Sequence, residues 1–274
     1  MATNDTTTNG NRPLALVTGA SSGIGLELAR VFARNGFALV MNAEDAALDE
    51  AAAQLRASGT DAEAIRADLT ESGEVERLYA QATRDGRKVD ALALNAGVGA
   101  GGDFARGTSL DKELRLVDLN VRSTVHLAKL GLRDMVGRNE GRVLFTSSIA
   151  STMPGSYQAV YNASKSFVQS FALALRDELR DTEVTVTSLM PGPTETEFFE
   201  RAEMQDTKVG ASDKDDPAQV AQQGFDAMMS GDERVVGGGL STKAQALASR
   251  VLPDSAKAAM HRRMAQPGSA KEEQ

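Results

Sequence analysis

Short runs of apolar residues recur along the chain and are separated by segments of mixed character. A short apolar run without polar alternation is typical of a strand that is buried on both faces of its sheet. Leu14–Thr18 is the clearest example, because it is apolar up to its threonine. We predict strands at Leu14–Thr18, Phe37–Met41, Glu63–Ala67, Val89–Leu94, Arg142–Thr146 and Val184–Met190, with a further short strand at Arg234–Val236.

The segments between these runs carry apolar residues at helical spacing, with charged residues among them. Asn35 and Gly36 are suited to end the first helix, and Ser72 and Ser109 to cap later ones. Predicted helices include Asp45–Ala57, Ser109–Val136, Gly155–Arg180 and Ala218–Met229, with a loop and a short helix over residues 195–217. Alternating strands and helices predict an α/β fold: a single, doubly wound parallel sheet with helices on both faces.

The composition fits one such domain and excludes several kinds of function. The chain has 274 residues, of which 41% are hydrophobic and 25% charged. Its formal net charge of −8 argues against binding of nucleic acid. The absence of cysteine excludes disulfides and thiolate metal sites, and His126 and His261 are too far apart to predict a metal site.

The two ends of the chain differ from its centre. Residues 1–12 lack the basic start and apolar centre of a signal peptide, so we expect a disordered tail. No apolar run of about 18 residues is present, so we expect no transmembrane segment and a cytoplasmic location. Residues 13–240 form the predicted main domain. Residues 241–274 are a predicted helical extension, broken at Pro253 and disordered from Gln266 on; whether it covers the site, a neighbouring subunit or a membrane surface stays open.

The first predicted strand runs directly into a glycine-rich turn that opens a helix. Its spacing is not G-x-G-x-x-G, because three residues separate Gly19 from Gly23 and one separates Gly23 from Gly25. Such a turn places backbone N–H groups and the positive end of a helix where a pyrophosphate can bind. The alternative is a tight turn without a ligand. The predicted cofactor contacts here are Thr18, Gly19, Ser21, Ser22, Gly23, Ile24 and Gly25.

The end of the second strand bears on the choice of dinucleotide. An acidic residue there binds the ribose hydroxyls and repels a 2′-phosphate. Glu44 follows this strand, and no arginine or lysine stands at this end or in place of Ser22. We therefore favour NAD over NADP. Two alternatives stay open: Glu44 only starts the next helix, or Asn42 recognises the ribose.

Tyr161 and Lys165 lie four residues apart on a predicted helix and therefore share a face. An ammonium near a phenol stabilises the phenolate and lowers the tyrosine pKa, which makes a proton-transfer group. Most pairs at this spacing are surface features, so the pair alone does not establish chemistry.

Five features occur in order over residues 14 to about 196: the glycine turn, Asn95-Ala96-Gly97, Ser148 thirteen residues before Tyr161, Tyr161-x-x-x-Lys165, and Pro191-Gly192. Together they resemble the short-chain dehydrogenase/reductase family. The resemblance implies a Rossmann-type sheet and an NAD(P)-dependent oxidoreductase that interconverts an alcohol and a ketone or aldehyde.

The resemblance also implies roles for individual residues. Tyr161 would be the general acid/base, Lys165 would lower its pKa and hold the nicotinamide ribose, and Ser148 would orient the substrate oxygen. Asn120 would bend its helix and hold a water of the proton relay. Further cofactor contacts would be Asp68 and Leu69 at the adenine, Asn95, Ala96 and Gly97 at the middle, and Pro191, Gly192 and Thr194 at the carboxamide.

Substrate and assembly are less well defined by the sequence. Irregular segments at Val98–Phe104, Ala150–Tyr157 and Pro193–Glu200 would form an apolar wall for a small carbonyl or alcohol. The wall residues would be Phe104, Met153, Tyr157, Phe198 and Phe199. The two long helices are apolar on more than one side, which together with the family resemblance predicts a homodimer or homotetramer.

Two other functions remain as alternatives. A dinucleotide-binding sensor or scaffold without turnover would be expected to lack Tyr161, Lys165 or Ser148, and all three are present. A methyltransferase on a similar sheet would share the glycine turn but would have no use for the tyrosine–lysine pair.

Overall fold

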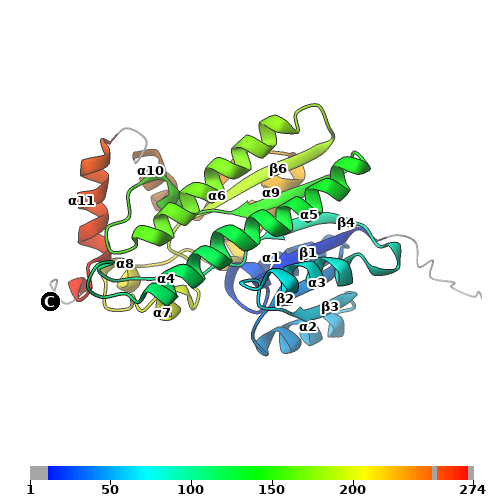
Figure 1. Cartoon of the computed structure of the whole chain (residues 1–274), viewed down its shortest axis with the longest axis horizontal. Helices are drawn as coiled ribbons and strands as arrows, with labels where there is room; N and C mark the ends of the chain where they lie inside the picture. Colours follow the sequence, from blue (N-terminus) through cyan, green and yellow to red (C-terminus); the bar gives the residue numbers. More distant parts are fainter. Residues whose placement is uncertain (1–11, 249–251, 271–274) are drawn as a thin grey trace, which may run out of the picture.

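The structure is a computed structural model, and it describes residues 12–248 and 252–270. Within these residues, seven strands form one parallel sheet in the order β3-β2-β1-β4-β5-β6-β7 (Figure 1). The predicted fold class, a doubly wound parallel α/β sheet, is confirmed. Residues 1–11 of the tail predicted over 1–12, residues 249–251 and residues 271–274 lie outside the described residues.

The strands are β1 (Leu14–Thr18), β2 (Ala38–Ala43), β3 (Ala62–Arg66), β4 (Val89–Leu94), β5 (Gly141–Thr146), β6 (Val184–Pro191) and β7 (Arg234–Gly237). The helices are α1 (Gly23–Arg34), α2 (Ala47–Ala57), α3 (Ser72–Ala82), α4 (Leu110–Val117), α5 (Thr124–Gly137), α6 (Ala159–Glu178), α7 (Phe198–Arg201), α8 (Lys208–Ala211), α9 (Pro217–Ser230), α10 (Leu240–Ala248) and α11 (Asp254–Ala265).

Helices cover both faces of the sheet because each face presents apolar side chains. Successive residues of a strand point to opposite faces, so Leu16 and Val17 of β1 belong to different cores. Val17 packs with α1, α2 and α9, and Leu16 with α3, α5 and α6. In Figure 1, α5 and α6 lie in front of the sheet and α9 lies behind it.

The strand order reverses between β1 and β4. The chain first builds outward from β1 to β3 and then returns to place β4 on the other side of β1. The carboxyl ends of parallel strands lie at one edge of the sheet, and the loops after β1 and β4 diverge there. Such a switch point leaves a crevice in which ligands bind.

Two predicted element ends differ from the structure. Strand β2 starts after Phe37, which packs against Phe32, and it continues through Asn42, whose amide donates to the carbonyl of Ile65 at 3.0 Å. Ser72 does not cap α3. The backbone N–H of Val75 donates to the carbonyl of Glu71. The N-cap of the helix is therefore Glu71, one residue earlier than predicted.

The predicted helix from Ser109 to Val136 is present but interrupted. The Ser109 side chain accepts a hydrogen bond from the Lys112 N–H at 3.3 Å, which confirms it as the cap of α4. A π-helical turn, Asp118–Ser123, separates α4 from α5. Such turns are frequent at functional sites, and this one carries Asn120.

Helix α6 begins at Ala159, later than the predicted start at Gly155. Tyr157 has a φ of 64°, a left-handed conformation that cannot belong to an α-helix. A Cβ atom at Gly155 would lie 2.1 Å from Cγ of Asn162, so this turn packs tightly on the helix that follows.

The described part of the C-terminal extension forms α10 and α11, and α11 begins directly after Pro253. The Nδ1 atom of His261 on α11 lies 2.9 Å from the carbonyl oxygen of Ser156, so this helix packs against the loop before α6. Of the helices in the described ranges, none has both the length and the apolar character of a membrane span. The cytoplasmic location stays a prediction.

Residues 266–270 form a turn, so the disorder predicted for them is wrong. The Gly268 N–H donates to the carboxylate of Asp206 at 2.7 Å, and the Ala270 N–H donates to the carbonyl of Asp206 at 3.0 Å. These bonds connect the end of the described chain to the segment between α7 and α8.

Phe32 tests the core between α1 and α9. It is fully buried, and its ring meets Phe37 and Phe225 edge-on at centroid distances of 5.1 and 5.2 Å. Phe32→Ala should lower the free energy of unfolding by about 3–5 kcal/mol in urea denaturation. Phe104, which is 57% exposed, is the control, and its replacement by Ala should cost less than about 0.5 kcal/mol. Equal losses would contradict this description of the core.

Candidate active site

The turn after β1 is built for close approach of a ligand to the backbone. Gly19 and Gly23 have φ values of 65° and 55°, which favour glycine. A Cβ atom at Gly25 would lie 2.0 Å from the carbonyl oxygen of Gly19, so no larger residue fits there. The Ser22 side chain makes no capping hydrogen bond to α1. The first N–H groups of this helix are therefore available to an anion such as a pyrophosphate.

Thr18 connects β1 to β4. Its hydroxyl accepts hydrogen bonds from the N–H groups of Asn95 and Ala96, both at 3.0 Å. The Asn95 side chain donates to the Thr18 carbonyl at 3.1 Å and accepts from the Thr146 hydroxyl at 3.1 Å. Thr18 is 1% exposed. Thr18 is not part of the cavity lining and its hydroxyl is engaged within the protein, so the structure shows a connecting residue here. Its contact with a cofactor stays a prediction.

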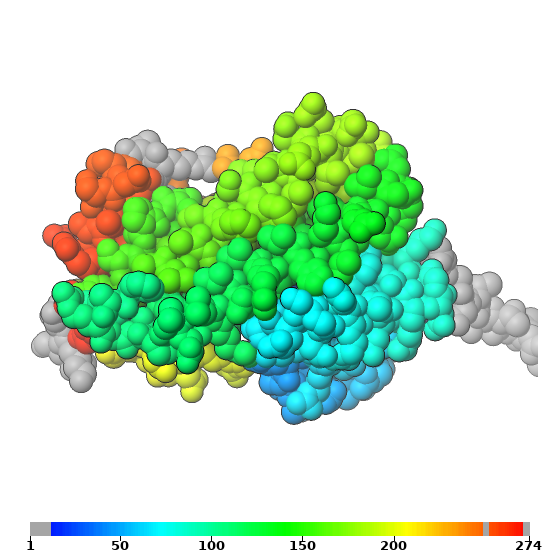
Figure 2. Space-filling model, viewed as in Figure 1, coloured from blue at the N-terminus to red at the C-terminus, as the bar shows by residue number. Residues whose placement is uncertain are grey.

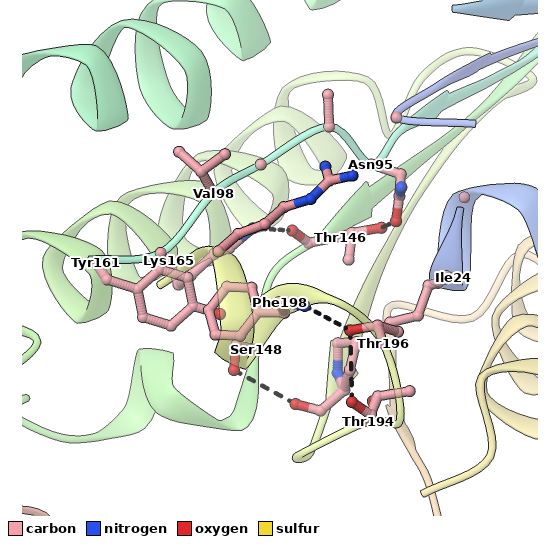
Figure 3. Close-up of a pocket in the computed structure, with 18 of the residues that line it drawn as sticks. Ile24, Asn95, Val98, Thr146, Ser148, Tyr161, Lys165, Thr194, Thr196 and Phe198 are labelled. Atoms are coloured by element: carbon pink, nitrogen blue, oxygen red, sulfur yellow. Dashed lines mark hydrogen bonds between the residues drawn. The ribbon is translucent and has the colours of Figure 1, made fainter. Parts of the chain in front are cut away.

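Tyr161, Lys165 and Ser148 converge on one side of a cavity at this edge (Figure 3). Tyr161 and Lys165 lie on successive turns of α6, and Ser148 follows β5. Lys165 Nζ donates to the Thr146 carbonyl at 2.9 Å and lies 5.9 Å from the centroid of the Tyr161 ring. Phe198 packs on the phenol ring with a centroid distance of 5.1 Å. All three polar residues are buried.

Burial controls the protonation of this pair. It raises the pKa of Tyr161 to about 12, although a hydrogen bond with Ser148 acts in the opposite direction. It lowers the pKa of Lys165 to about 8. The predicted lowering of the Tyr161 pKa is therefore not what the structure gives, because the loss of water around the phenolate outweighs the hydrogen bond. Near pH 7 the phenol is neutral and the lysine is mostly protonated.

Asn120 connects the π-helical turn to the segment after β4. Its Oδ1 accepts from the Val98 N–H at 2.9 Å, and its Nδ2 donates to the Ser164 hydroxyl at 3.0 Å. A Cβ atom at Gly97 would lie 3.1 Å from Asn120 Oδ1 and 3.2 Å from Lys165 Nζ. The absence of a side chain at Gly97 therefore allows Asn120 and Lys165 to approach the same point.

The segment after β6 is held by Asp215. Its N–H donates to the Pro193 carbonyl at 2.8 Å. Its carboxylate accepts from the Gly239 N–H at 2.7 Å and from the Thr242 hydroxyl at 2.5 Å. One residue thus connects this segment to the turn after β7 and to α10.

Charged side chains gather where β2 and β3 end. Arg115 of α4 places Nη2 2.7 Å from Glu44 and 3.1 Å from Asp68. Burial alone would raise the pKa of Asp68, but hydrogen bonds from Thr70 and the charge of Arg115 outweigh it and hold this pKa below its usual value. No cation was predicted at this end. The structure corrects that prediction, because a helix distant in sequence supplies one.

The opposite part of the cavity is mainly apolar. Of the predicted wall residues, Met153, Phe198 and Phe199 line it. Phe104 and Tyr157 are not part of the lining. Phe104 is 57% exposed, and Tyr157 packs with Phe199 without reaching the cavity itself. The cavity lining also contains residues that were not predicted for the site: Gln158, Gln245, His261 and Met264. Burial lowers the pKa of His261, with partial compensation by the Ser156 carbonyl, so this imidazole is neutral at pH 7.

The structure brings most predicted site residues into this one cavity. The lining includes Gly19, Ser21, Ser22, Gly23, Ile24, Gly25, Glu44, Asp68, Leu69, Asn95, Ala96, Gly97, Ser148, Tyr161, Lys165, Pro191, Gly192 and Thr194. Of the predicted site residues, Thr18 and Asn120 are not part of the lining, but they bond to Ala96 and Val98, which are. Nowhere in residues 12–248 and 252–270 do three or more His, Asp or Glu side chains gather as metal ligands would.

A glycine turn at the switch point of a doubly wound sheet, with tyrosine, lysine and serine at the same edge, defines an oxidoreductase of the Rossmann type. The family model described as short chain dehydrogenase matches residues 13–207. The chain belongs to this family.

Individual relatives cover most of the chain. It is 35% identical over 207 residues to 1-deoxy-11-beta-hydroxypentalenate dehydrogenase of Streptomyces exfoliatus. The matched region covers 73% of this chain and 75% of that protein. The structure is similar to a Burkholderia phymatum short-chain dehydrogenase/reductase in complex with NAD (TM-score 0.79, 27% identity, 88% and 92% covered). It is also similar to a Sphingobium yanoikuyae short-chain dehydrogenase in complex with NADPH (TM-score 0.77, 28% identity, 87% and 93% covered).

Lys165→Met should make the protein more stable at neutral pH. The pKa of Lys165 falls from 10.5 to about 8 on folding, so its charge destabilises the folded state below pH 8, and this cost disappears as the pH rises to 10.5. A shift of this size corresponds to about 3 kcal/mol of folding free energy, which the variant would gain. The variant also loses the hydrogen bond to Thr146, which reduces this gain by about 1 kcal/mol. In urea unfolding we expect a gain of about 2 kcal/mol at pH 7 and a loss of about 1 kcal/mol at pH 10.5, where only the missing hydrogen bond counts.

The matched control is Lys88→Met, because Lys88 is exposed. Its effect should be small and independent of pH. A gain for Lys165→Met that is equal at both pH values would show that the buried charge is not its source.

Proposed function

We propose that the protein transfers a hydride between NAD(P) and a small molecule, interconverting an alcohol and a ketone or aldehyde. The observation that carries the proposal is the burial of Tyr161, Ser148 and Lys165 in the same cavity as the glycine turn. Two structural relatives bind NAD and NADPH. A sequence relative whose name describes a hydroxy-compound dehydrogenase supports chemistry at a CH–OH group.

The cavity would offer a separate region to each part of the dinucleotide. The turn from Gly19 to Gly25 would hold the pyrophosphate with backbone N–H groups. Asp68 and Leu69 would contact the adenine, and Asn95, Ala96 and Gly97 would contact the middle of the cofactor. Pro191, Gly192 and Thr194 would hold the carboxamide. Of the two cofactors, NAD is favoured because the Glu44 carboxylate lines the cavity where β2 ends.

Tyr161 transfers the proton. The bound dinucleotide supplies or accepts the hydride. In reduction the neutral phenol donates its proton to the carbonyl oxygen, and in oxidation the phenolate takes the proton of the alcohol. The Ser148 hydroxyl orients this oxygen, and the Lys165 ammonium opposes the negative charge that forms on the phenol. Asn120 positions a water that continues the proton path from Lys165.

The substrate is a small carbonyl or alcohol with an apolar body. Met153, Phe198, Phe199 and Met264 line the cavity, and Phe198 packs directly on the Tyr161 ring. His261 adds one polar group to this wall, and α11 brings it there. The C-terminal extension therefore takes part in choosing the substrate.

Tyr161→Phe tests the mechanism. The variant lacks the transferable proton and keeps the ring that packs on Phe198. Turnover of a carbonyl panel with NADH or NADPH should fall about 10²–10⁴-fold, while the dinucleotide Kd in fluorescence titration should change little. Tyr79→Phe is the control, because Tyr79 bonds to Asp134 away from the cavity. A Tyr161→Phe variant that turns over as fast as Tyr79→Phe would disprove the proton-transfer role.

We also propose that the chain assembles as a homodimer or homotetramer through α4, α5 and α6. Figure 2 shows this face toward the viewer. It carries large apolar side chains that are more than a third exposed in the single chain: Leu110, Leu114, Val117, Val125, Val136 and Phe167. Apolar patches of this kind mark contacts between proteins, and a two-fold axis lets the same patch serve both copies.

Leu114→Glu should break this assembly. Leu114 is 51% exposed in the single chain, and in the proposed interface a carboxylate at this position would be buried without a partner. Sedimentation should give a smaller particle for the variant than for the wild type. Leu240→Glu on α10, where Leu240 is 86% exposed, should leave the size unchanged. A monomeric wild type, or an unchanged size for Leu114→Glu, would contradict the proposed interface.

A further inference from the structure

A cluster of three charged side chains lies where β2 and β3 end, and we name it the Glu44–Arg115–Asp68 cluster. Arg115 Nη2 lies 2.7 Å from Oε2 of Glu44 and 3.1 Å from Oδ2 of Asp68. The side chains of Glu44, Arg115 and Asp68 are 55%, 50% and 34% exposed. Ion pairs this exposed contribute little to stability, so the arrangement is easily exchanged for another.

The position of the cluster relates it to the choice of cofactor. In doubly wound sheets, an acidic residue after the second strand binds the ribose hydroxyls of NAD, whereas a nearby arginine accommodates the 2′-phosphate of NADP. Here both kinds of residue are present, and they are bonded to each other. Glu44 and Asp68 line the cavity, and Arg115 reaches them from α4.

Arg115 contacts two acids of the cavity lining, whereas the lysine and the arginine of the described lining itself are held by other partners. Lys165 donates to the Thr146 carbonyl, and Arg201 pairs with Glu197 at 2.5 Å. Arg115 is therefore the guanidinium that is bonded to the acids after β2 and β3. A guanidinium matches a phosphate with two parallel hydrogen bonds, so it is chemically suited to a 2′-phosphate.

We propose that Arg115 is a latent ligand for the 2′-phosphate of NADP, and that Glu44 keeps the protein selective for NAD by occupying it. The cluster carries two negative charges and one positive, and its net charge of −1 opposes a phosphate. Without Glu44, the cluster is neutral and the guanidinium is free to turn to the phosphate. The proposal rests on the proposed dinucleotide binding, and it is independent of the role of Tyr161.

Simple charge repulsion by Glu44 would also favour NAD, and the two explanations differ in what they require of Arg115. If Glu44 acts only through its own charge, its removal helps NADPH whether or not Arg115 is present. If Glu44 acts by occupying Arg115, the benefit disappears in the absence of Arg115. A double-mutant cycle separates these explanations.

The experiment compares the wild type with Glu44→Ala, Arg115→Met and the double variant. The Kd values for NADH and NADPH are measured by fluorescence titration, which needs no turnover. We expect Glu44→Ala to tighten NADPH binding by about tenfold or more, as for charge-assisted hydrogen bonds. The same change in the Arg115→Met background should tighten it by no more than about twofold. The tightening in Glu44→Ala should also weaken as the salt concentration rises.

Glu76→Ala is the matched control. It removes one exposed carboxylate, which lies 3.6 Å from Nε2 of His126, without touching the cluster. Its NADPH affinity should equal that of the wild type. Thermal melting of every variant verifies that the fold is kept, which the exposure of the cluster favours.

Two results would overturn the proposal. Equal tightening of NADPH by Glu44→Ala with and without Arg115 would leave charge repulsion as the explanation. NADPH binding that none of the variants changes would remove the cluster from cofactor choice, while the proposed function would stand. Failure of the wild type to bind NADH or NADPH would instead refute the proposed function and this inference together.

Discussion

Hydrogen bonds among Thr18, Asn95 and Thr146 tie the carboxyl ends of the three central strands together. The rest of the site depends on this connection. The glycine turn starts directly after Thr18, and the carbonyl of Thr146 receives the Lys165 ammonium at 2.9 Å. The side chain of Thr146 thus aligns the strands while its backbone places the lysine. The positions of the glycine turn and of Lys165 are therefore both set by the hydrogen bonds at the ends of these three strands.

The second constraint is electrostatic. Tyr161 and Lys165 are both enclosed, so the charged form of each is disfavoured: the pKa of the tyrosine rises, that of the lysine falls, and the two values move apart. A protein selected for stability alone would place apolar side chains here. The pair is retained at a cost in stability, which is typical of groups held ready for proton transfer.

Much of this architecture follows from the sequence, because strands buried on both faces and glycine turns leave local signals. The strands, the switch-point turn and the approach of Ser148 to Tyr161 were all predicted. What the sequence did not reveal depends on tertiary contacts. Arg115 of α4 bonds to Glu44, which lines the cavity, and α11 brings His261 into the lining. The Thr18 hydroxyl is bonded to the segment after β4. Tyr157 adopts a left-handed turn that no local pattern marks, and it is not part of the lining.

Asp215 makes three separate parts of the chain into one mechanical unit. It holds the segment after β6, the turn after β7 and the first turn of α10, which precedes the helix that carries His261. A shift of these C-terminal helices around a bulky substrate would therefore pull on the region assigned to the carboxamide. We therefore expect that the dinucleotide and the substrate do not bind independently. The order in which they bind and leave would be linked through the carboxylate of Asp215.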